Sequence, residues 1–171
     1  MIDKATYFVY SFNNPALYLI ADLMDSQAFL VIAIGLLIIL FEGKEKDLTR
    51  IGKRISKILF IILIAYILTE GLKNVFAVQR PCVSEIVSKI PCPDDFSFPS
   101  GHVLIAASIM FAYIKKREFI VLWILTILVA FTRMYLGVHT IVDVAGSIAL
   151  APLIFHFSNV MWRWIFGVNT E

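Results

Sequence analysis

Five apolar runs constrain the fold of this 171-residue chain more than any other feature. They cover residues 28–41, 58–69, 103–114, 119–132 and 144–155, and the last continues to residue 164. A helix needs about 20 residues to cross a bilayer, so we expect polar ends to complete each helix near the lipid headgroups. Strands are not expected, because an open sheet edge is not viable in lipid. The sequence therefore predicts an all-α polytopic membrane bundle with about five transmembrane helices.

The composition supports a lipid environment. Hydrophobic residues make up 60% of the chain and charged residues only 16%, against about 45–50% and about 25% in soluble domains. One soluble core of this size could not bury so much apolar surface, and disordered chains are poor in apolar residues. The net charge is +2 and no basic tract is flanked by aromatic residues, so no nucleic-acid partner is expected. We expect a single domain over residues 1–171. The sequence does not indicate its oligomeric state.

The N-terminal segment, residues 1–25, is apolar but interrupted by Asn13-Asn14-Pro15. Proline is favoured at the first position of a helix. We expect a short interfacial helix before Pro15, and an interfacial or partly inserted helix after it. No cationic leader with a cleavage site is seen, so no removable signal peptide is expected.

The distribution of basic residues predicts the orientation in the membrane. Residues 42–57, the turn 115–117 and Arg163 carry ten of the fifteen Lys and Arg residues on one side. The positive-inside rule makes this side cytoplasmic. The N-terminus, the loop 73–101 and the turn 133–140 then face outward.

Six ionisable residues lie near helix ends on this outer side. They are Lys73, Arg80, His102, Arg133, His139 and Asp143. Ionisable groups at the edge of a membrane span are costly, so their gathering on one side indicates a functional site.

The first two cations are seven residues apart, which is about two helical turns. Lys73 and Arg80 would share a helix face if the helix ran as far as Pro81. Glu70, one turn earlier, could pair with Lys73 or simply end the hydrophobic stretch. Taken alone, the two cations could also be lysine and arginine side chains that reach the interface from a helix end.

A short polar segment precedes the third apolar run. Ser100 suits a helix N-cap, and Gly101 permits close backbone approach. The free N–H groups and the dipole at a helix start bind anions. His102 would lie in the first turn, where it could be part of a site or incidental to a capped helix.

Arg133, His139 and Asp143 follow the fourth run. The i, i+4 spacing would place His139 and Asp143 on one helix face. A carboxylate that binds one ring nitrogen leaves the other free as a nucleophile. A simple ion pair on the helix surface is the alternative.

Taken together, these residues suit phosphoryl transfer. Three cations match the charge of a phosphoryl group, and two histidines can divide nucleophilic attack and protonation of the leaving oxygen. Two histidines and a carboxylate can also ligate zinc. The surrounding cations would repel zinc, so no metal and no cofactor are expected.

Two cysteines, Cys82 and Cys92, lie in the outer loop. If that loop faces a periplasm they can form a disulfide, which would stabilise the fold by about 2–3 kcal/mol in the loop-entropy model. Two free thiols are the alternative.

Three motifs give the chain a resemblance to the type 2 phosphatidic acid phosphatase (PAP2) superfamily. Residues 73–81 resemble its K-x6-R-P motif, and residues 99–102 its P-S-G-H motif. Residues 132–143 resemble its third motif, S-R-x5-H-x3-D, with Thr132 in place of the usual serine. The three motifs span residues 73–143 in the family's order and with its internal spacing.

The resemblance implies roles for the motif residues. His139 would be the nucleophile that forms a phosphohistidine, Asp143 would orient it, and His102 would act as general acid and then base. The phosphate oxygens would be held by Lys73, Arg80, Arg133, the Ser100 hydroxyl and the Gly101 N–H. The family works without a metal.

The resemblance also implies the function. We expect a metal-independent lipid phosphatase that hydrolyses a phosphomonoester or pyrophosphate on a lipid headgroup. We expect it in the bacterial inner membrane with its site facing the periplasm. Overall resemblance favours lipid A 1-phosphate as substrate. Undecaprenyl pyrophosphate, phosphatidylglycerol phosphate and lipid-to-lipid phosphotransfer are alternatives, whereas a non-catalytic lipid-binding protein would need neither nucleophile nor acid.

Overall fold

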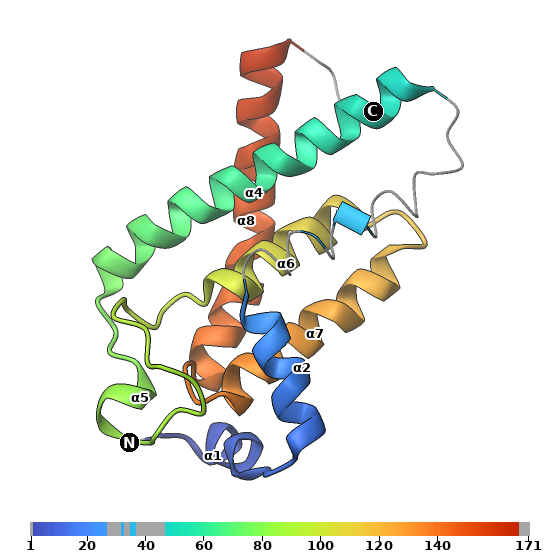
Figure 1. The fold of residues 1–171 in the computed structure, drawn as a ribbon. Coiled ribbons are helices and arrows are strands. Elements are labelled where there is room, and N and C mark those ends of the chain that lie inside the picture. Colours follow the sequence, from blue (N-terminus) through green and yellow to red (C-terminus); the bar gives the residue numbers. More distant parts are fainter. Residues whose placement is uncertain (1, 27–31, 33–34, 37–46, 168–171) are drawn as a thin grey trace.

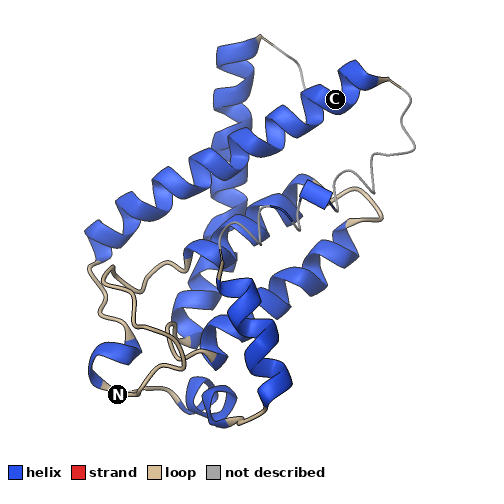
Figure 2. Cartoon of the chain, in the orientation of Figure 1, coloured by secondary structure: helices blue, strands red, loops and turns tan. Residues whose placement is uncertain are grey.

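The computed structural model describes residues 2–26, 32, 35–36 and 47–167. Within these residues the chain forms the helices α1 (Lys4–Ser11), α2 (Pro15–Asp25), α4 (Leu48–Phe76), α5 (Pro81–Ser84), α6 (Gly101–Ala112), α7 (Phe119–Tyr135) and α8 (Ile141–Phe166) (Figure 1). Over the described residues the chain forms no strand (Figure 2), which confirms the predicted all-α class.

The helices follow four of the five apolar runs. The helices α4 and α8, of 29 and 26 residues, are long and apolar enough to cross a membrane. The apolar helices α6 and α7 are shorter, with 12 and 17 residues. Only 28% of an apolar 18-residue stretch of α4 is buried inside the bundle, as expected of a helix that faces lipid rather than a soluble core. The predicted span at 28–41 lies largely outside the described residues.

Helix α6 forms the centre of the bundle, packed against α4, α7 and α8. Every residue from Val103 to Met110 is buried. A helix that is apolar all round is buried either among other helices or in lipid, and α6 is covered by its neighbouring helices. Ala106 and Ala107 are small, so the neighbouring helices can approach α6 closely.

The two N-terminal helices pack against α7. Asp3 caps α1 through the Thr6 N–H, and Asn14 caps α2, which begins at Pro15 as predicted. The Thr6 hydroxyl oxygen also accepts a hydrogen bond of 2.8 Å from the Ile141 N–H. This bond ties α1 to the first residue of α8, so the N-terminal segment is attached to the end of the bundle that carries the motifs (Figure 1).

The loop from residue 77 to residue 100 covers the same end. Cys82 and Cys92 form a disulfide with 5.9 Å between their Cα atoms. The Lys89 N–H donates to the Leu136 carbonyl at 3.0 Å, and the Lys89 ammonium lies 3.4 Å from the centre of the Tyr135 ring. The loop is thus fastened both to itself and to the turn that follows α7.

The condition under which Lys73 and Arg80 would share a helix face is not met. Helix α4 ends at Phe76, where Ala77 adopts a left-handed conformation with φ of 47°, and Arg80 is the extended N-cap of α5. Lys73 and Arg80 therefore share no helix face. Pro81 begins a new short helix instead of ending α4, because proline suits the first helical position and not the interior.

Candidate active site

A cavity of about 310 Å³ opens at the end of the bundle that carries the motifs. Six of the eight predicted site residues line it, and they are Lys73, Arg80, Gly101, His102, Arg133 and His139. Ser100 and Asp143, both buried, are outside this lining. The cavity is also lined by two acidic residues that the sequence analysis did not assign, Asp25 and Asp95.

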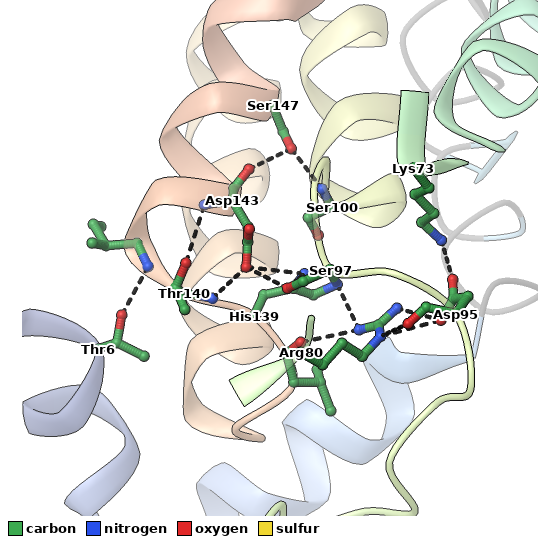
Figure 3. Close-up of polar contacts among 12 residues, drawn as sticks. Thr6, Lys73, Arg80, Asp95, Ser97, Ser100, His139, Thr140, Asp143 and Ser147 are labelled. Carbon is green, nitrogen blue, oxygen red and sulfur yellow. Dashed lines mark hydrogen bonds and ion pairs between the residues drawn. The ribbon is translucent and has the colours of Figure 1, made fainter. Parts of the chain in front are cut away.

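The imidazole of His139 is held on both of its nitrogens (Figure 3). Its Nε2 lies 3.1 Å from Nη1 of Arg80, and its Nδ1 lies 3.4 Å from Oγ of Ser97. A guanidinium can only donate hydrogen bonds, so Nε2 must be the unprotonated nitrogen and Nδ1 must carry the hydrogen. The lone pair on Nε2 is the group that a nucleophilic histidine needs.

The electrostatic surroundings keep this imidazole neutral. Burial lowers the pKa of His139, the Asp143 carboxylate opposes that effect, and the charges of Arg80 and Arg133 lower the pKa further. The net result is a pKa below the ordinary range of histidine. A neutral ring is the reactive form for attack on phosphorus.

The contact between His139 and Asp143 differs from the one predicted. His139 precedes α8, whose N-cap is Thr140, so the two residues do not share a helix face. Asp143 is the third helical residue and completes a capping box, in which its Oδ2 accepts the Thr140 N–H at 2.7 Å. This cap turns the carboxylate back toward His139, but its Oδ2 stays 3.7 Å from Nδ1.

Two of the three cations meet on one carboxylate. Lys73 forms an ion pair with Asp95, and Arg80 reaches Oδ1 of Asp95 through Nη2 at 2.6 Å and through Nε at 3.1 Å. Partial burial raises the pKa of Asp95, but the hydrogen bonds and charges of Lys73 and Arg80 outweigh this and hold the pKa below its ordinary value. Lys73 also lies 3.3 Å from Oε1 of Glu70, so of the two readings left open for Glu70 the ion pair is the one found.

The third cation and the second histidine meet at the end of α2. Arg133 forms an ion pair with the carboxylate of Asp25, and Nε2 of His102 lies 2.8 Å from the Asp25 carbonyl oxygen. A carbonyl oxygen only accepts, so Nε2 of His102 carries a hydrogen. Nε2 is therefore the nitrogen from which His102, once its ring is cationic, can donate a proton.

The start of α6 is held by hydrogen bonds that link its backbone to α8 through the Ser147 side chain. Ser100 is the N-cap, as predicted, but its hydroxyl does not cap the helix and has no hydrogen-bond partner among the described residues. Its N–H donates to Oγ of Ser147 at 2.8 Å, and Ser147 in turn donates to the Asp143 carbonyl at 2.6 Å. A Cβ at Gly101 would lie 3.3 Å from the Thr69 methyl group, so glycine permits the close approach of α4.

Thr132, which departs from the family pattern, is satisfied within its own helix. Its hydroxyl donates to the Val129 carbonyl at 2.8 Å, and it does not line the cavity. The extra methyl group therefore does not alter the cavity wall.

Sequence reasoning missed three contacts of the site: Asp25, Asp95 and Ser97. The two acidic residues could have been suspected, because three cations at a membrane edge need counter-charges. Asp95 and Ser97 also lie within five residues of Ser100. Asp25 and Arg133 are 108 residues apart, and no local pattern connects them.

The fold and the groups around the cavity together define a class of protein. It is a helical membrane bundle with a neutral imidazole, a second proton-bearing imidazole and three cations around one cavity near its end. These groups suit the transfer of a phosphoryl group.

Comparison with known families gives the same assignment. The PAP2 superfamily model matches residues 54–167, which is two thirds of the chain. The chain therefore belongs to the PAP2 superfamily.

Two curated relatives each match about half of this chain. Phosphatidylglycerophosphatase B of Bacillus subtilis (strain 168) is 33% identical over 102 residues, covering 52% of this chain and 48% of the relative. Undecaprenyl-diphosphatase of Sulfolobus acidocaldarius is 35% identical over 101 residues, covering 56% and 49%. The chain thus spans about half the length of these relatives.

Two crystal structures share the fold. A transmembrane PAP2 type phosphatidylglycerolphosphate phosphatase from Bacillus subtilis aligns with a TM-score of 0.65 at 22% identity, covering 96% of this chain and 85% of that one. LpxE of Aquifex aeolicus aligns with a TM-score of 0.68 at 20% identity, covering 92% and 93%. These matches confirm the predicted fold as a polytopic membrane bundle of the PAP2 type. The number of spanning helices stays a prediction.

Proposed function

We propose that this chain is a metal-independent membrane lipid phosphatase that works through a phosphohistidine on His139. The observation that carries the proposal is the unprotonated Nε2 of His139 beside Arg80, in a cavity that His102 also lines. A site for phosphate capture alone needs cations, but it needs neither a neutral nucleophile nor a second histidine with a proton to donate.

The first chemical step forms the phosphoenzyme. Nε2 of His139 attacks phosphorus while the bond from phosphorus to the leaving oxygen breaks. His102, with a cationic ring at this step, gives its Nε2 proton to that oxygen and becomes neutral. Arg80 contacts Nε2 in the structure, so it must turn to a phosphoryl oxygen before attack. Lys73, Arg80 and Arg133 then neutralise the oxygens on which negative charge builds up.

The second step returns the enzyme to its starting state. Nε2 of His102, now unprotonated, accepts a proton from water, and the resulting hydroxide equivalent attacks phosphorus. The bond between phosphorus and His139 breaks, inorganic phosphate leaves, and His102 again carries its proton. This exchange of roles is what general acid–base catalysis by one residue requires.

The walls of the cavity favour a lipid over a soluble ester. Ile62 and Tyr66 of α4 and Ile105 of α6 line it together with the charged groups. Tyr66 is exposed on the side of α4 where Leu59, Leu63 and Ile67 are exposed too. A headgroup can thus reach the cations while its hydrocarbon chains stay beside apolar side chains.

Three lipids are candidates for the substrate. The sequence resemblance favours lipid A 1-phosphate, and the shared fold with LpxE of Aquifex aeolicus is compatible with it. The names of the relatives at 33–35% identity favour phosphatidylglycerol phosphate and undecaprenyl pyrophosphate. Transfer from the same phosphohistidine to a second lipid is the remaining alternative.

The proposed location is the inner membrane of a bacterium, with the cavity facing the periplasm. The basic loops predict this orientation. The disulfide between Cys82 and Cys92 supports it, because the bridge lies at the same end of the bundle as the cavity and disulfides persist in oxidising compartments.

The test is release of phosphate from a panel of the three lipids by purified protein without an acceptor lipid. The wild type should release phosphate from at least one lipid, and His139→Ala should not. His156→Ala, which changes an exposed histidine of α8, is the matched control and should keep full activity. Equal activity of His139→Ala and wild type would refute the nucleophile, and release only when an acceptor is added would favour phosphotransfer.

A further inference from the structure

Ser97 lies between the two groups that are expected to act together, although it belongs to none of the three motifs. Its side chain is buried, with 1% of the residue exposed. Its hydroxyl donates to Oδ2 of Asp143 at 2.5 Å, and its oxygen lies 3.4 Å from Nδ1 of His139 (Figure 3). The direct distance from Nδ1 to Oδ2 is 3.7 Å, which is too long for a hydrogen bond.

The hydrogens in this chain of contacts can be placed from the donors and acceptors. An ionised carboxylate only accepts, so the single hydrogen of the Ser97 hydroxyl points to Asp143. The Ser97 oxygen then has only lone pairs for His139, so Nδ1 must carry the hydrogen. The contact of Arg80 with Nε2 requires the same tautomer independently.

We propose that Ser97 is a positioning residue that connects the imidazole of His139 to the carboxylate of Asp143. It holds the ring with its Nε2 lone pair toward the cavity. It also transmits the stabilising effect of the carboxylate when attack on phosphorus makes the imidazole cationic. This inference rests on the proposed phosphohistidine chemistry.

The backbone around Ser97 supports a positioning role. The Ser97 N–H donates to the Val78 carbonyl at 2.8 Å, which anchors the segment to the chain that leaves α4. Two residues earlier, Asp95 contacts Lys73 and Arg80. One short segment therefore contacts two of the cations through Asp95 and the carboxylate behind the nucleophile through Ser97.

The alternative is a purely structural role, in which the hydroxyl only satisfies a buried carboxylate. Asp143 already accepts the Thr140 N–H on the same oxygen, so it is not without a partner if Ser97 is removed. A structural role predicts lower stability of Ser97→Ala with unchanged chemistry. A positioning role predicts slower chemistry in a folded protein.

The experiment uses the full chain in detergent and the lipid found in the panel assay. In Ser97→Ala, kcat should fall about 10- to 100-fold, as for loss of a hydrogen bond to a charged group, while KM changes by less than about twofold. Ser97→Thr keeps a hydroxyl and should recover most of kcat. Ser108→Ala removes an equally buried serine hydroxyl of α6 that has no hydrogen-bond partner in the described residues, and it should behave as wild type.

A measurement independent of turnover completes the test. Nitrogen-15 NMR of labelled protein should show His139 protonated on Nδ1 in the wild type. Ser97→Ala should shift the Nδ1 resonance, because this nitrogen loses its hydrogen-bond acceptor while Arg80 still holds the tautomer through Nε2. An Nε2-protonated ring in the wild type, or a folded Ser97→Ala with unchanged kcat, would overturn the inference. Retained activity in His139→Ala would instead overturn the proposed function and leave the tautomer result standing.

Discussion

Replacing Asp95 by asparagine should strengthen the binding of phosphate to the site. In the structure the Asp95 carboxylate contacts both Lys73 and Arg80, the two cations that the proposed function assigns to the phosphate oxygens. The carboxylate and an incoming phosphate therefore compete for the same donors. Asparagine has the same size and retains one oxygen acceptor, but it carries no charge to repel the phosphate.

The size of the effect follows from the charge and its exposure. Two unit charges about 4 Å apart interact by about 1 kcal/mol in water and by about 4 kcal/mol at an effective dielectric constant of about 20. The Asp95 side chain is 39% exposed, so water screens it and the lower value applies. Removing a repulsion of about 1–1.5 kcal/mol strengthens phosphate binding about 5- to 12-fold.

The effect should not vary across the neutral pH range. Lys73 and Arg80 hold the pKa of Asp95 below its ordinary value against the opposing effect of burial, so the carboxylate is ionised throughout. The gain in affinity would disappear only in acid, where the wild-type carboxylate is protonated and no longer competes with phosphate.

The assay is competitive inhibition of lipid hydrolysis by inorganic phosphate and by orthovanadate. The matched control is Asp94→Asn, which removes an exposed charge of the same loop that forms no ion pair with Lys73 or Arg80 in the described part of the chain. The control should leave both inhibition constants within about twofold of wild type. Weaker inhibition of Asp95→Asn would refute the reasoning and show that Asp95 orients the two cations instead of competing for them.

Four further outcomes are expected. His139→Ala should lose turnover while its thermal unfolding in detergent stays near that of wild type, and a large loss of stability would mean that the ring is mainly structural. Orthovanadate should inhibit whereas EDTA should not, and recovery of EDTA-treated enzyme by zinc would contradict the metal-free mechanism. Reduction of the bridge between Cys82 and Cys92 should lower stability by about 2–3 kcal/mol, and unchanged unfolding on reduction would show that the loop is held by its other contacts. A membrane-impermeant thiol reagent applied from the periplasm should label a cysteine placed at Asp94 but not one placed at Lys53, and the reverse pattern would invert the topology.

The sequence predicts the residue types of the site better than their contacts. Charged residues at the ends of apolar runs are rare enough to stand out, so the cations and both histidines could be found without a structure. Their mutual arrangement could not. Lys73 and Arg80 would share a helix face only if α4 ran to Pro81, but the chain leaves the helix at Ala77. The expected helical pairing of His139 with Asp143 failed because α8 begins after His139.

The sequence alone determined the features that depend on near neighbours along the chain. Apolar runs form helices in lipid because no other spanning structure satisfies their backbone groups, apart from a closed barrel. Pro15 begins a helix because its ring presets the backbone angle and it lacks an N–H that the first turn could not use.

Only the tertiary structure decided which groups meet across the cavity. Asp25 reaches Arg133 across 108 positions of the sequence, and Ser97 reaches Asp143 across 46. Such contacts depend on how helices pack and where a loop is fastened, and these are properties of the whole bundle. A local pattern of residue types contains no information about them, because many packings can satisfy the same pattern.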